Sequence, residues 1–366
     1  MSWIDGFKTS NIVIISSITS FLILEFSYRY ITATPEKSEY VNATRLFEAG
    51  NNFQNHDGFF KYFPNEEIRS VTLYAKSNPK SIKDLIVEYD YTINTNNLGL
   101  VMRNDVFSNE RVVFVIGDSF TEGQGATPWF YDIEKSYVID NAKIVNLGIL
   151  GTGPQQWKNL AKSISKELQL DNVATVINII PDDMGRGIRT FSEPALNCLH
   201  LASCDYSDGF QGGFRGYKFQ EEESYDDIKQ SVLTMLIEDP IPESNFKKII
   251  RKSKVISDIY FFLGSNKSLN HELNESSIMA LNKASSGNFF VNVVSQKNID
   301  STNFKKSKSA TRLLEFLEKK GIAHKWCDIP ANGYYKYDGH PNANGYKILR
   351  ECTREAIEIL KPGIDN

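Results

Sequence analysis

VVFVIGDSFTEGQG, residues 112–125, passes from an apolar run directly into a glycine, a carboxylate and a hydroxyl. The opening residues are β-branched or aromatic, which is typical of a buried strand. Asp118 and Ser119 follow where the strand would end, and a serine at a sharp strand-to-helix turn exposes its hydroxyl. The stretch predicts a buried strand leading into a functional site. An Asp-Ser helix N-cap is the alternative, and these residues alone do not decide between the two.

From Arg111 onward, apolar runs of strand length alternate with segments of helical periodicity. One helical segment begins at Pro154, and another ends at Gly321. Such alternation is typical of a parallel sheet with helices on both faces. We predict an α/β fold, a flavodoxin-like three-layer sandwich, around a parallel five-stranded sheet. Its strands are expected at 112–116, 143–147, 173–180, 289–294 and 322–328.

The polar segments that follow these strands should meet, because ligands bind at the carboxyl ends of parallel strands. His340 follows the last strand and is the candidate base for Ser119. Pro341 and the apolar stripe of a terminal helix would hold it at a helix entry, although a plain helix start is the simpler interpretation of that pair. Asp338 stands two residues before His340, so in an extended segment its carboxylate can reach the imidazole.

Four blocks of the sequence resemble the SGNH, or GDSL, hydrolase family, in the family's order. They are GDSFTEG at 117–123, NLGILGTG at 146–153, PDDMG at 181–185 and DGHPNANGY at 338–346. The resemblance covers residues 111–361 apart from an insertion. It implies Ser119 as nucleophile, His340 as general base and Asp338 as its orienter. It also implies the backbone amides of Ser119 and Gly151 as oxyanion donors, and no metal, nucleotide or other cofactor.

Two features depart from the family pattern. Family members place an asparagine side chain in the oxyanion hole, and the matching residue here is Asp182. An ionised carboxylate there would repel an oxyanion. Asp182 is therefore expected to be protonated or turned away from the oxyanion hole; otherwise the protein has a function other than ester hydrolysis. The second departure is the single residue between Asp338 and His340, where many members have two. Asp328 is the fallback orienter.

Residues 1–31 predict a membrane anchor. Residues 11–24 carry no charge, and the apolar character continues to Ile31 with Glu25 and Arg29 near the far end. A spanning helix needs roughly 20 mostly apolar residues, so the uncharged part alone is short, and a cleaved signal peptide is the alternative. Residues 32–110, which follow this segment, resemble the lead-in of anchored bacterial family members. This implies a single-pass protein of the cytoplasmic (inner) membrane with its catalytic domain outside the cytoplasm.

Two further segments are predicted besides the anchor and the main part of the hydrolase domain, which spans 111–366. Residues 32–110 have no strong helical period and predict an extended, β-rich lead-in. Residues 184–285 are too long for a simple connection and predict an insertion or lid.

The chain has four cysteines. Cys198 and Cys204 bracket a short segment that a disulfide could close, which would indicate an oxidising compartment; two ordinary thiols are the alternative. Cys327 and Cys352 fall in a predicted strand and a predicted helix, and we predict that they are buried apolar filler.

A net charge of -4 gives no basic field, so a nucleic acid is not expected as a partner. The sequence predicts a serine esterase or O-acyltransferase that forms an acyl-enzyme on Ser119. Analogy with anchored relatives suggests acyl esters of a cell-envelope glycan as the substrate. The alternative is a non-catalytic glycan-binding or assembly protein whose oxyanion hole is disabled by Asp182. The sequence does not identify the acyl group, its acceptor or the oligomeric state.

Overall fold

The computed structural model describes residues 39–48, 52–108, 110–136, 142–191, 214–219, 223–238 and 267–364, with a few isolated positions elsewhere. Residues Tyr40–Asp239 and Lys267–Asn366 belong to one compact unit. The predicted anchor, 1–31, and the predicted Cys198–Cys204 pair lie outside the described ranges. Of the helices that the structure describes, none combines the length and the apolar character that a bilayer crossing needs.

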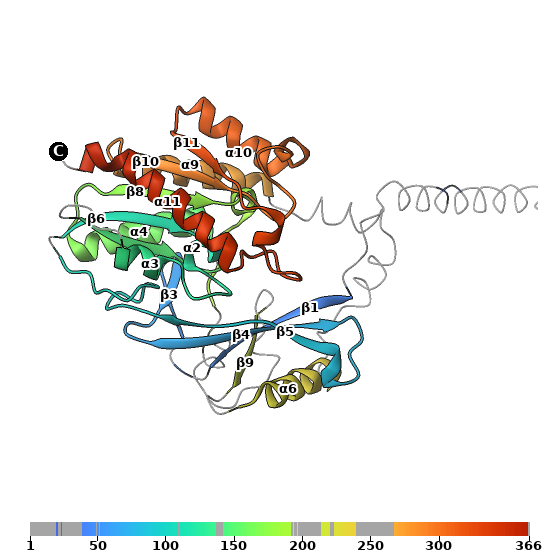
Figure 1. Ribbon diagram of the computed structural model, residues 1–366. Helices are drawn as coiled ribbons and strands as arrows, with labels where there is room; N and C mark the ends of the chain where they lie inside the picture. The colour runs from blue at the N-terminus through green and yellow to red at the C-terminus, as the bar shows by residue number, and fades with distance from the viewer. Residues whose placement is uncertain are drawn as a thin grey trace, which may run out of the picture. The chain divides into compact units, whose positions relative to one another are not determined.

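Residues from Arg111 onward form a five-stranded sheet in which all strands run parallel (Figure 1). Its spatial order is β11-β10-β8-β6-β7, which is the flavodoxin-like order. Every residue of β8 and β10 is buried, so both faces of the sheet are covered. The predicted parallel five-stranded sheet is confirmed. The strands are β6 (Arg111–Gly117), β7 (Ala142–Gly148), β8 (Ala174–Ile179), β10 (Phe289–Val294) and β11 (His324–Cys327).

Helices cover the sheet with their apolar stripes. α4 (Pro154–Leu168) contacts β6 and β7 and packs against α9 (Lys267–Ala284), while α11 (Ala343–Ile364) contacts β8 and β10. In α4, the buried residues Trp157, Leu160, Ile164 and Leu168 recur at helical spacing, which turns this stripe inward. The shorter helices are α2 (Ser119–Glu122), α3 (Phe130–Ser136), η2 (Pro181–Gly185), η3 (Phe304–Lys306), α10 (Lys308–Lys319) and η4 (Ala331–Gly333).

Most strands of the predicted lead-in, residues 32–110, belong to a second sheet. Its order is β5-β4-β1-β9, and the first three strands pair antiparallel. Apolar residues of its outer face, Leu46, Val71 and Leu73 among them, form a separate core with Ile228 and Val232 of α6. Its elements are β1 (Tyr40–Glu48), β4 (Glu67–Lys76), β5 (Leu85–Asn94), β9 (Phe214–Phe219) and α6 (Tyr225–Glu238), with η1 (Ile82–Asp84) before β5. A short hairpin, β2 (Phe53–His56) and β3 (Phe59–Tyr62), follows β1.

The segment predicted as an insertion, 184–285, contributes strand β9 to the second sheet and helix α9 to the layer that covers the five-stranded sheet. β9 pairs parallel with β1, so it extends the second sheet rather than standing apart. α9 lies between β8 and β10 in the sequence, so it belongs to the crossover that joins two parallel strands. The weak amphipathic pattern of α9 explains why the sequence did not predict this helix.

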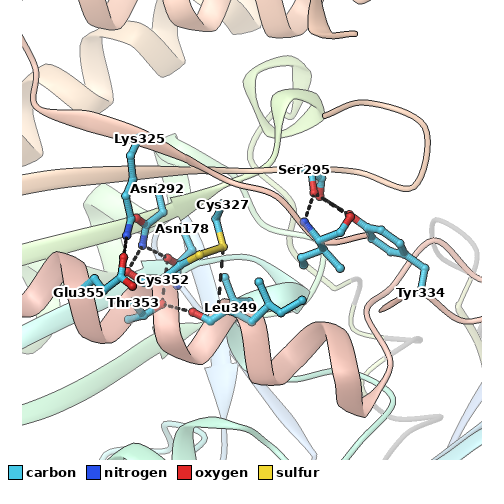
Figure 2. Close-up of a disulfide and its surroundings, with 12 residues drawn as sticks. Asn178, Asn292, Ser295, Lys325, Cys327, Tyr334, Leu349, Cys352, Thr353 and Glu355 are labelled. Atoms are coloured by element: carbon cyan, nitrogen blue, oxygen red, sulfur yellow. Dashed lines mark hydrogen bonds and ion pairs between the residues drawn. A yellow bond between two sulfur atoms is a disulfide. The ribbon is translucent and has the colours of Figure 1, made fainter. Parts of the chain in front are cut away.

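Cys327 and Cys352 form a disulfide, so the prediction that they are unpaired apolar filler is wrong (Figure 2). Their Cα atoms lie 5.9 Å apart, within the range that a disulfide spans. β11 and α11 lie side by side, and each places one cysteine at the contact. A separation of 25 residues gave no local spacing signal from which the pairing could have been predicted.

Candidate active site

Ser119 lies at the sharp turn that joins β6 to α2. The turn is tight because Gly117 has no side chain; a Cβ there would come within 2.0 Å of Thr121 Oγ1 and 2.6 Å of the Asn178 carbonyl oxygen. Asp118 caps α2 by accepting a hydrogen bond of 2.9 Å from the Phe120 amide. The helix then ends after one turn at Gly123, which has left-handed backbone angles. The N-cap interpretation is therefore right for Asp118, and it leaves Ser119 available.

The structure brings Ser119, His340 and Asp338 together. Ser119 Oγ lies 2.8 Å from His340 Nε2, and His340 Nδ1 lies 2.5 Å from Asp338 Oδ1. The hydroxyl also faces Asp118 at 3.4 Å, a longer contact than the one with His340. Asp338 accepts a second hydrogen bond, of 3.0 Å, from the His340 amide, so one intervening residue is enough for the contact. Asp328, the fallback orienter, instead accepts hydrogen bonds from Ser301.

The Asp338 carboxylate is buried but remains ionised. Burial acts to raise the pKa of Asp338, and the imidazole of His340 and the hydroxyl of Tyr89 outweigh it and hold that pKa well below its usual range. An ionised carboxylate accepts the proton of Nδ1, which leaves the lone pair of Nε2 directed at Ser119. The arrangement can therefore remove the serine proton when Ser119 attacks an electrophile.

Two residues that sequence reasoning missed contact this constellation. Tyr89 of β5 donates a hydrogen bond of 2.8 Å to Asp338 Oδ2. Gln124 donates to Tyr89 at 2.5 Å and lies 3.3 Å from His340 Nδ1. Gln124 follows the quoted GDSFTEG block directly, so its nearness to Ser119 was a usable signal. Tyr89 comes from a different sheet, and no sequence pattern indicated it.

The amides of Ser119 and Gly151 suit an oxyanion. Within the described residues, neither amide donates a hydrogen bond to another protein group. The preceding amide, that of Leu150, is already used by Glu122 at 2.6 Å. Gly151 has a φ of +66°, and a Cβ built there would lie 2.9 Å from Arg189 Nη1, so the guanidinium of Arg189 lies beside this glycine. Burial and the neighbouring guanidinium of Arg186 lower the pKa of Arg189 to about 10.

Asp182 and Asp183 occupy opposite environments. Asp182 is exposed, and it accepts a hydrogen bond of 2.9 Å from Gln296 in the loop after β10. Asp183 is buried and forms an ion pair of 2.6 Å with Arg186. Arg186 also donates to Asp118 at 2.9 Å and to the Thr152 carbonyl oxygen at 2.8 Å. One guanidinium thus joins the loops that follow β6, β7 and β8.

The described residues offer no metal centre. Throughout these ranges, no group of three or more His, Cys, Asp or Glu side chains is arranged to hold a metal ion.

Comparisons with known proteins give matches of structure alone: no protein-family model and no curated protein matches the chain. A GDSL-like lipase from Bacteroides thetaiotaomicron is 12% identical, with a TM-score of 0.30 over 68% of this chain and 88% of that protein. A member of the lipolytic G-D-S-L family from Veillonella parvula is 13% identical, with a TM-score of 0.31 over 67% and 97% of the two chains. An acetylxylan esterase from Geobacillus stearothermophilus is 11% identical, with a TM-score of 0.34 over 69% and 95%. Similarity at this level assigns no function to the chain.

Proposed function

We propose that this chain is a serine esterase of the SGNH type, in which Ser119 forms an acyl-enzyme. The observation that carries the proposal is the hydrogen-bonded series from Ser119 through His340 to Asp338, at 2.8 and 2.5 Å. A nucleophile, a base and an orienting carboxylate in direct contact are the arrangement that activates a serine hydroxyl. Ser119 lies more than 200 residues from the Asp338 and His340 pair in the sequence, so local sequence preference does not explain its contact with His340.

The proposed reaction begins when Ser119 Oγ attacks the carbonyl carbon of an ester. The hydroxyl proton passes to His340 Nε2, and Asp338 stabilises the imidazolium that forms without taking its proton. The amides of Ser119 and Gly151 stabilise the oxyanion of the tetrahedral intermediate. The bond to the alcohol oxygen then breaks, and His340 returns the proton to the departing alcohol. The acyl group remains on Ser119.

Deacylation repeats these steps with a second hydroxyl. Water attacks the acyl-enzyme while His340 accepts its proton, and the carboxylic acid leaves as Ser119 regains a proton. An O-acyltransferase differs in one respect only, because a sugar hydroxyl takes the place of water. Hydrolysis and transfer use the same protein groups, so the proposal covers both.

We place the enzyme in the bacterial inner membrane, with residues 1–31 as its anchor and the catalytic domain outside the cytoplasm. The Cys327–Cys352 disulfide supports an oxidising compartment. An acylated cell-envelope glycan is the substrate we expect there, and no nucleic acid is expected. Protease treatment of intact spheroplasts checks the location: the domain should be digested if it faces outward, and should survive if it faces the cytoplasm.

The activity is tested with p-nitrophenyl acetate and a fluorophosphonate probe. We expect the wild type to release p-nitrophenol and to be labelled, and Ser119→Ala to lose both because the nucleophile is gone. Ser277→Ala is the matched control, since this buried serine on α9 donates to the Leu273 carbonyl oxygen and has no other partner among the described residues. Labelling that persists in Ser119→Ala would place the nucleophile elsewhere.

A wild type that is neither labelled nor active favours the second candidate, a glycan-binding or assembly protein on the same fold. Calorimetric titration of the wild type with an acetylated glycan separates the two, since a binder shows affinity and releases no acetate, whereas the esterase releases acetate. Adding a deacetylated glycan to the active enzyme distinguishes transfer from hydrolysis, because only transfer forms a new glycan ester, seen by mass spectrometry.

A further inference from the structure

A hydrogen-bonded series connects the second sheet to the candidate active site. Arg45 of β1 donates to Gln124 Oε1 at 2.5 Å, Gln124 Nε2 donates to Tyr89 at 2.5 Å, and Tyr89 donates to Asp338 at 2.8 Å. Arg45 and Gln124 are at most 6% exposed, as is Tyr89, so water does not compete for these contacts. The series continues through His340 to Ser119.

Each hydrogen bond in this series can run in only one direction, from donor to acceptor. Arg45 is cationic and can only donate, so Gln124 must present its carbonyl oxygen to it. The amide nitrogen of Gln124 then faces Tyr89 and donates to the phenol oxygen. Tyr89 has a single hydroxyl proton, and with its oxygen occupied as an acceptor that proton is directed at Asp338. Arg45 thus sets the direction of every hydrogen bond that follows.

Neighbouring groups hold Arg45 and the loop of Gln124 in place. Arg45 also donates to Tyr91 and to Ser70, and it lies 3.6 Å from the buried carboxylate of Glu122 on α2. The backbone carbonyl oxygen of Gln124 accepts a hydrogen bond of 2.6 Å from the Tyr346 hydroxyl of α11. Burial and the Asp338 carboxylate raise the pKa of Tyr89 well above its usual value, so the phenol stays protonated and can donate.

We propose that Tyr89 and Gln124 are positioning residues, and that Gln124, oriented by Arg45, directs the Tyr89 hydroxyl to Asp338 and so fixes the carboxylate that orients His340. The inference rests on the proposed roles of Ser119 and His340. It makes the second sheet part of the active site, because Arg45 and Tyr89 belong to β1 and β5. Burial and the Asp338 carboxylate raise the pKa of Tyr74 of β4, so β4 also places a phenol near this carboxylate.

Two near-isosteric substitutions in the full-length protein test the proposal. Tyr89→Phe removes the hydroxyl. Gln124→Glu keeps an acceptor for Arg45 but replaces the amide donor with a second acceptor, which draws the Tyr89 proton away from Asp338. We expect each to lower kcat for p-nitrophenyl acetate about tenfold with KM changed less than about twofold, since one hydrogen bond to a charged group is lost. The double variant should lose no more than either single variant, because both remove the same contact.

Tyr131→Phe is the matched control. The Tyr131 hydroxyl is also buried and also binds β5, at Asn94, but it contacts none of the active-site groups. Its kcat should stay within about twofold of the wild type. A wild-type kcat in Tyr89→Phe, losses that multiply in the double variant, or an equal loss in Tyr131→Phe would each overturn the proposal.

Proton NMR separates this inference from the proposed function. The proton that His340 Nδ1 shares with Asp338 should give a low-field resonance in the wild type. It should move or broaden in Tyr89→Phe and in Gln124→Glu, and stay in place in Tyr131→Phe. The resonance is independent of turnover. If the wild type hydrolyses no ester but the resonance responds in this way, the positioning role stands and only the esterase proposal is rejected. If the resonance does not move in Tyr89→Phe or Gln124→Glu, the positioning role is rejected.

Discussion

Arg186 Nη1 donates a hydrogen bond of 2.9 Å to Asp118, the residue that immediately precedes Ser119. Asp118 is fully buried, and its other oxygen caps the helix that carries the serine. The same guanidinium pairs with the buried Asp183. One cation therefore balances two carboxylates behind the candidate nucleophile, and it holds the Ser119 turn to the loop after β8.

Replacing Arg186 by Met should destabilise the protein strongly. Two buried carboxylates would lose their cation, and breaking a buried ion pair costs about 3–5 kcal/mol of unfolding free energy. Urea denaturation of the variant measures this cost. Arg354→Met is the control, because its ion pair with Glu351 is about half exposed and should contribute about 1 kcal/mol or less. Similar losses in the two variants would contradict the role of Arg186.

Gly151→Ala should reduce activity more than it reduces stability. The new Cβ would lie 2.9 Å from Arg189 Nη1, so the loop that carries the Gly151 amide must shift. Losing one oxyanion donor typically lowers kcat about 10²–10³-fold. Gly321→Ala is a matched control, because Gly321 has a similar φ of +64° and no atom within 4 Å of its built Cβ. Both variants should lose about 1–2 kcal/mol of stability from left-handed strain, and only Gly151→Ala should lose turnover.

The sequence predicted the parallel sheet because its central strands are mostly apolar and polar residues follow them. Ser119 could be named because its motif follows a strand directly, and Asp338 and His340 because they share a short motif just before the terminal helix. Tyr89 and Arg45 could not be named, since their contacts with the site depend on how a second sheet packs. Cys327 and Cys352 were missed for a similar reason: their pairing depends on the packing of α11 on β11.

Removing the Cys327–Cys352 disulfide should lower stability without changing the active site. A bond that closes a loop of 25 residues stabilises a fold by about 3 kcal/mol, mainly by restricting the unfolded chain. The Cys327→Ser, Cys352→Ser double variant should therefore have a lower Tm and a similar kcat. Reducing agent should bring the wild type to the Tm of the variant and leave the variant unchanged. An equal effect of reductant on both proteins would assign the stabilisation to another source.

Asp90→Asn should destabilise the protein in a pH-dependent way. Burial acts to raise the pKa of Asp90, but hydrogen bonds from Arg69 and Tyr225 outweigh it and lower that pKa below its usual value. The ionised carboxylate therefore contributes stability above about pH 4, and the contribution is lost as pH falls through the folded-state pKa. The difference in unfolding free energy between wild type and variant should be about 1 kcal/mol at pH 6 and should shrink below pH 4. Asp226→Asn, at a largely exposed site, should show no such trend.

Asp182→Asn tests the carboxylate that stands where the SGNH pattern has an oxyanion-hole asparagine. Asp182 is exposed and accepts a hydrogen bond from Gln296, so solvent and this amide weaken the effect of its charge on an oxyanion. We expect kcat to stay within about twofold of the wild type, as for other surface substitutions. Asp183→Asn is the contrasting neighbour, since it removes the buried charge that pairs with Arg186 and should lower stability. A tenfold or greater rise in kcat for Asp182→Asn, roughly the size of an oxyanion-donor effect, would mean that the carboxylate does face the oxyanion and suppresses hydrolysis.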